Sequence, residues 1–94
     1  MPTTEPPHSP TYCFSVYAAR DASVMSRVLE LFAKRGLVPL RFHGEAAGRE
    51  LAIDLQVRGL AAETAAHIAR CLGAMVAVER VLTAVKAEPR EAGR

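Results

Sequence analysis

The sequence has no tryptophan, only 5% aromatic residues and no run of basic residues, and its formal net charge is +2. Domains that bind nucleic acids usually gather Lys and Arg on one surface and interleave them with aromatic side chains that stack on bases. In this chain the basic residues are spread along the whole length. The composition therefore argues against a nucleic-acid partner.

Long apolar segments are missing as well. The first residues have neither the basic start nor the apolar centre of a secretory signal, and no window approaches the roughly 20 apolar residues of a membrane span. We therefore expect a cytoplasmic protein without membrane contact. The chain has only two cysteines. Because Cys13 and Cys71 form no paired motif, we expect both to be buried free thiols.

Motifs that carry catalysis are also absent. The chain contains no glycine-rich phosphate loop, no nucleophile elbow and no inward-facing pair of carboxylates. We interpret His43 and His67 as isolated histidines, and Glu63, four residues before His67, as part of a solvent-facing pair. The sequence thus predicts no catalytic residue, no metal site and no cofactor, and it indicates a protein that is not an enzyme.

With 94 residues, the chain has room for one domain with a small core, whose stability is expected to depend on a partner. Residues 1–11 are rich in proline and show no apolar period, which predicts an extended leader. Residues 86–94 are charged and interrupted by Pro89, which predicts a tail. The folded unit is expected to span residues 12–85.

Two segments have the period of half-buried strands. Residues 12–19 place Phe14, Val16 and Ala18 on one side, and residues 51–57 alternate in the same way. The other two predicted strands have weaker signals.

Residues 37–43 are short and apolar but contain Pro39, which favours an edge strand, and their facing is ambiguous from the sequence. We interpret residues 44–50 as the turn that follows. Residues 76–85 predict a last strand, with a bulge near Glu79 where the alternation slips.

Two helices are expected between these strands. The first follows Asp21 and Ser23, which can accept hydrogen bonds at a helix start, and it ends at Gly36, with basic residues in its last turn. The second spans residues 60–72, where alanines form a face of small side chains that can approach a sheet closely. Gly73 is expected to end this helix.

The predicted order is βαββαβ, an α+β arrangement. Two right-handed split crossovers then place both helices on one face of a four-stranded antiparallel sheet, which is the ferredoxin-like fold. The other face stays open for solvent or a partner. Four polar positions are expected to line it: Ser15, Tyr17, Asp54 and Gln56.

The run FSVYAARDASVMSRVLELFAKRGLVPLRF, followed by LAIDLQV and LGAMVAVERV, resembles the ACT-domain small regulatory subunit of acetolactate (acetohydroxyacid) synthase. The resemblance covers most of the chain and is strongest at Ser26-Arg27-Val28, at Arg35-Gly36 and in the closing MVAVERV. The chain is most similar to the short small subunits of the valine-resistant isozyme.

The resemblance implies a regulatory subunit in branched-chain amino acid biosynthesis. Such a subunit stabilises or activates a thiamine-diphosphate-dependent catalytic subunit, with weak or absent valine feedback. The alternative is a free-standing amino-acid-binding ACT module that regulates another metabolic enzyme.

The resemblance also implies a homodimer that joins through the second strand and the first helix, and a small effector such as a branched-chain amino acid at the seam. From the residues alone, Asp21 and Ser23 either cap the helix or contact this effector. The positions that match the family's effector site are Arg20, Asp21, Ala22, Ser23, Leu37, Val38, Pro39 and Leu40.

Overall fold

The computed structural model describes residues 10–86 and contains four strands and two helices. The predicted leader over residues 1–11 and the predicted tail over residues 86–94 lie almost entirely outside the described residues. The elements in chain order are β1 (Thr11–Ala19), α1 (Ser23–Ala33), β2 (Arg41–Ala47), β3 (Glu50–Arg58), α2 (Ala62–Gly73) and β4 (Val78–Lys86).

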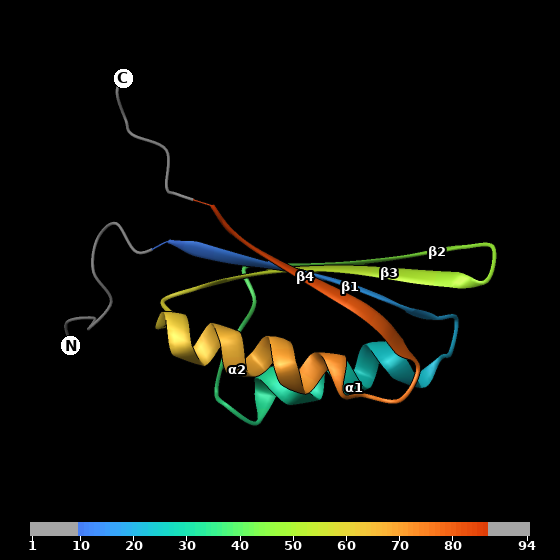
Figure 1. Cartoon of the computed structure of the whole chain (residues 1–94), viewed down its shortest axis with the longest axis horizontal. Coiled ribbons are helices and arrows are strands. Elements are labelled where there is room, and N and C mark those ends of the chain that lie inside the picture. The colour runs from blue at the N-terminus through green and yellow to red at the C-terminus, as the bar shows by residue number, and fades with distance from the viewer. Residues whose placement is uncertain (1–9, 87–94) are drawn as a thin grey trace, which may run out of the picture.

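The strands form one antiparallel sheet in the order β2-β3-β1-β4. Both helices lie on the same side of this sheet (Figure 1), and within residues 10–86 no element covers the other side. The predicted ferredoxin-like βαββαβ fold is therefore confirmed. β1 and β3 are central strands, whereas β2 and β4 are the two edges.

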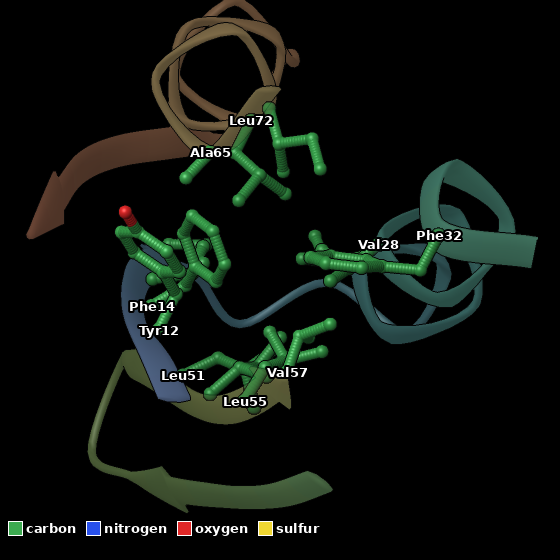
Figure 2. Close-up of a cluster of buried hydrophobic side chains, with 14 residues drawn as sticks. Tyr12, Phe14, Val28, Phe32, Leu51, Leu55, Val57, Ala65 and Leu72 are labelled. Atoms are coloured by element: carbon green, nitrogen blue, oxygen red, sulfur yellow. The ribbon is translucent and has the colours of Figure 1, made fainter. Parts of the chain in front are cut away.

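The core lies between the helices and one sheet face. Figure 2 shows side chains from β1, β3, α1 and α2 converging on one another. The rings of Phe14 and Phe32 meet edge to face, with their centroids 5.7 Å apart, an arrangement that adds to the burial of apolar area. The strict alternation of β1 and β3 supplies one face of this core, as the sequence predicted.

α1 ends as expected from its glycine. Gly36 has a φ of +69°, and the N–H of Leu37 then donates to the carbonyl of Phe32 at 3.0 Å. Gly36 thus occupies the left-handed position after a helix that favours glycine. Lys34 is the C-cap residue and Arg35 follows it, so the basic residues lie just beyond the last turn and not in it.

The second strand differs from the prediction. It spans Arg41–Ala47 and not 37–43, because Pro39 lacks an N–H and the ladder starts only with the Leu40 N–H, which donates to Gln56 O at 2.7 Å. The interpretation of residues 44–50 as a turn was also wrong. The turn consists of Gly48 and Arg49 alone, and Gly48 has a φ of +63°, as two-residue hairpin turns require.

The connection from α2 to β4 holds a second difference. α2 ends at Gly73, as expected, but it begins at Ala62 and not at Leu60, and the left-handed residue of the connection is Ala77, with a φ of +82°. The predicted bulge is confirmed, because the pairing of β1 with β4 steps from Arg80 to Val78 and leaves Glu79 unpaired.

Within the described residues, none of the helices is long and apolar enough to cross a membrane.

Replacing Phe32 tests the core. Phe32→Ala is expected to lower the free energy of unfolding by about 3–5 kcal/mol, because it leaves a cavity and removes the contact with Phe14. Urea unfolding monitored by circular dichroism measures this change. Val76→Ala is the control, since Val76 is 79% exposed and a change there is expected to cost less than about 0.5 kcal/mol. Equal losses for the two variants would contradict this description of the core.

Candidate functional site

The turn between β1 and α1 is bound to the β2–β3 hairpin through Arg20. The Arg20 guanidinium donates to the carbonyl of Gly48 at 2.9 Å, and the Arg20 N–H donates to the carbonyl of Arg49 at 3.0 Å. The predicted effector turn is therefore fixed to the hairpin tip. Arg20 uses part of its donor set in this way and does not point freely toward a ligand.

Asp21 binds the start of α1. One of its carboxylate oxygens accepts the Ser23 backbone N–H and the Ser23 hydroxyl, each at 2.9 Å. These two hydrogen bonds, assisted by the nearby positive charge of Arg27, hold the pKa of Asp21 below its ordinary value of 3.8. Of the two roles left open by the sequence, Asp21 takes the capping one in the single chain, whereas Ser23 is the first helical residue and its side chain donates to Asp21. The N-cap residue itself is Ala22.

A carboxylate at this point matters for ligand binding. The free N–H groups of a helix start attract anions, and here the chain's own carboxylate already occupies the Ser23 N–H. An amino-acid ligand that approached this turn would have to displace Asp21 or bind beside its negative charge.

The second predicted segment, Leu37, Val38, Pro39 and Leu40, connects α1 to β2. It follows the C-terminal end of α1, whereas residues 20–23 precede the N-terminal end of the same helix. An 11-residue helix is about 16 Å long, so one chain does not bring the two predicted segments together. A site made from both requires the second segment of another chain.

The free edge of the sheet carries an apolar strip. β2 pairs only with β3 among the described strands, and the Met25 side chain packs against Gly44 on this edge, where an added Cβ would lie 2.8 Å from its sulfur. We call the following exposed or half-exposed residues beside β2 the edge strip: Met25, Leu29, Val38 and Leu40.

The open face of the sheet has a polar hollow of about 160 Å³. Ser15 and Asp54, which the sequence placed on this face, lie in it as neighbours, and their side-chain oxygens are 3.3 Å apart. His43 and Glu45 of β2 also line the hollow, with their side chains 3.7 Å apart.

The sequence interpretation missed His43 and Glu45 as residues of the open face. It placed His43 at a strand end and Glu45 in a turn, whereas both lie inside β2. The alternation of Arg41, His43 and Glu45 with smaller or apolar residues was the available signal.

The predictions for the two cysteines and for His67 are only partly correct. Cys13 and Cys71 are free thiols, as expected, but both are partly exposed and not buried. His67 is not isolated, because its Nε2 lies 3.5 Å from the Cys71 sulfur one helical turn away. In the part of the chain that the structure describes, no three His, Cys, Asp or Glu side chains gather as metal ligands would.

Comparison with known proteins identifies the family. Residues 8–89 match the model of a family described as an ACT-like domain. No curated protein matches the chain.

Solved structures show the same fold at low identity. The ACT domain from GTP pyrophosphokinase of Chlorobium tepidum is 8% identical, with a TM-score of 0.71 over 81% of this chain and 99% of that one. The C-terminal domain of the MgtC protein from Mycobacterium tuberculosis is 12% identical, with a TM-score of 0.71 over 94% and 99%. An uncharacterized protein from Thermotoga maritima is 18% identical, with a TM-score of 0.65 over 82% and 96%.

The lowered pKa of Asp21 predicts a pH dependence of stability. Because the folded-state pKa lies below the unfolded one, the stabilising effect is complete above about pH 5 and disappears as the pH falls through the folded value. Asp21→Asn is therefore expected to be less stable than the wild type at neutral pH and to lose less stability on acidification. Urea unfolding over this pH range measures both effects.

Ser23→Ala is the matched variant for this experiment. It removes the hydroxyl donor and keeps the backbone donor, so the Asp21 pKa from an NMR titration should rise only part of the way. An Asp21 pKa at or above 3.8 in the wild type would show that these hydrogen bonds do not form in solution.

Proposed function

The chain belongs to the ACT-like domain family, and we propose on this basis that it is a non-catalytic regulatory module that works as a pair of chains. The two copies join along β2, and a small amino acid binds where the β1–α1 turn of one copy meets the 37–40 segment of the other. The observation that carries this proposal is the edge strip beside β2.

This edge of the sheet supports pairing because the backbone groups of β2 that do not pair with β3 lie beside the exposed apolar side chains of the edge strip. An edge strand is a template for a further strand, and two antiparallel copies of β2 would extend the sheet to eight strands. Val38 is 84% exposed and Leu40 is 60% exposed in the single chain. A neighbouring chain that covered them would remove apolar area from water at both ends of the seam.

The geometry of the turn favours weak binding of the amino acid. Asp21 holds the helix start that a ligand carboxylate would use, and Arg20 is bound to the hairpin carbonyl of Gly48. A ligand therefore has to compete with contacts inside the chain. This competition supports a module with a modest or absent response to valine.

The narrower proposal is that the partner enzyme is acetolactate synthase, with this chain as its small subunit. Support for it comes from the sequence, in the register of Ser26-Arg27-Val28, Arg35-Gly36 and the closing MVAVERV. In this role the chain would stabilise or activate the catalytic subunit without contributing a catalytic residue. The alternative is an ACT module that regulates another metabolic enzyme.

Placing a charge in the edge strip tests the pairing. Val38→Asp is expected to halve the mass of the assembly in sedimentation experiments, because the seam would bury a carboxylate without a partner. Val76→Asp is the matched control, with 79% exposure in the connection between α2 and β4, and should leave the mass unchanged. An unchanged mass for Val38→Asp would place the pairing surface elsewhere.

Mixing with the catalytic subunit tests the narrower proposal. We expect the chain to co-purify with a thiamine-dependent acetolactate synthase subunit, to raise acetolactate formation, and to give a mixture that valine inhibits little. The absence of both binding and activation would contradict the assignment to this enzyme. If binding and activation are absent but one amino acid raises the melting temperature of the chain by selective binding to the folded state, the alternative module is the better description.

A further inference from the structure

One row of residues across the open face has opposite charges at its two ends. The strand register places Glu45 of β2, Ala52 of β3, Tyr17 of β1 and Arg80 of β4 side by side at one level. The guanidinium carbon of Arg80 lies 4.1 Å from the centroid of the Tyr17 ring, so Arg80 is held over this face by a cation–π contact. The row therefore runs from an acid through a small and a large residue to a base.

The hollow on the same face favours a cation. Its lining includes the carboxylates of Glu45 and Asp54 and contains no Lys or Arg. His43 and Ser15 add polar atoms around them. A guanidinium has planar N–H donors that match carboxylate oxygens, so the chemistry of the hollow fits the end of an arginine side chain.

We propose that the open face binds a second copy of this chain, with Arg80 of each copy entering the hollow of the other. A two-fold axis parallel to the strands, midway between β1 and β3, places β2 of one copy opposite β4 of the other. At the level of the charged row, Glu45 then faces Arg80 of the second copy, and Ala52 faces its Tyr17. Charge and size are both complementary in this arrangement, as an isologous interface requires.

The other simple arrangement does not bring Arg80 to the hollow. A two-fold axis perpendicular to the strands lays β2 over β2 and β4 over β4, so Arg80 then faces β4 of the second copy and not Glu45. In the arrangement proposed, Leu82, which is 53% exposed, is opposite His43 of the second copy, and Cys13 is opposite Gln56. No two like charges on these rows face each other.

The area of the face sets the strength of this contact. Three strands of nine residues and one of seven, about 4.8 Å apart and with a rise of about 3.3 Å per residue, cover roughly 540 Å² per copy, or about 1,100 Å² in total, at the lower limit for a specific interface. Single chains should therefore stack weakly. Two edge-paired dimers present twice this area, so stacking would be firmer in that assembly, although the proposal itself does not depend on edge pairing.

Charge reversal and its rescue test this proposal. Arg80→Glu and Glu45→Arg should each halve the mass of the wild-type assembly in sedimentation equilibrium, because each brings like charges together. The double variant Arg80→Glu/Glu45→Arg should restore the mass. Arg70→Glu, a reversal of the same sign at an exposed position of α2, is the control and should have no effect. Circular dichroism verifies that each variant is folded, and either single variant suffices if the other does not fold.

The dependence of the assembly's mass on salt concentration distinguishes contacts through the open face from contacts through the edge strip. At about 1 M NaCl the Debye length is about 3 Å, so charge interactions are strongly screened. Stacking through the charged row should then weaken, whereas pairing through the edge strip should persist. Unchanged masses for both single reversals, or a double variant that stays dissociated, would overturn the proposal. So would a loss of catalytic-subunit binding in Arg80→Glu with no change in mass, since the face would then belong to that protein. A mass that changes only with Val38→Asp would contradict stacking, and a mass that changes only with the charge reversals would contradict edge pairing, so the failures of the two proposals are distinguishable.

Discussion

The structure depends on the burial of a single face of the sheet. Along β1, Phe14, Val16 and Ala18 are completely buried while Ser15 and Tyr17 between them point away from the core. Because both crossovers return to the same side of the sheet (Figure 1), both helices add their apolar stripes to one core. Within residues 10–86 no second layer covers the opposite face, so that face and both sheet edges keep polar or unpaired groups there.

How much of this was predictable from the sequence depends on where the burial of each element comes from. β1, β3 and α1 carry their burial in their own pattern, so local periodicity was sufficient. β2 does not, because its Gly44 is covered by Met25 of α1, a contact between distant positions that no local window contains. The turn after α2 was not predictable for a similar reason, since its left-handed residue is Ala77, in a backbone region that usually favours glycine, and the Ala77 carbonyl accepts the N–H of the distant Ala19.

The candidate site also combines features that the local sequence determines with features that depend on distant parts of the chain. The sequence located the β1–α1 turn, but it left open whether Asp21 caps the helix or meets a ligand, since both roles use the same carboxylate. The structure gives the capping geometry in the single chain. It also ties Arg20 to a carbonyl 28 residues away, which depends on where the hairpin lies and has no trace in the local sequence. The position of the turn was therefore predictable, whereas the contacts that its residues make within the chain were not.

The two exposed surfaces differ in the forces that act on them. The edge strip is apolar and lies beside unpaired backbone groups, so contacts there depend on desolvation and strand pairing. The open face presents Glu45, Asp54 and Arg80, so contacts there depend on charge and weaken with salt. An effector at the β2 seam would act directly on the first surface. It would reach the second only through the number of open faces that edge pairing places side by side, because the charged groups themselves lie outside the seam.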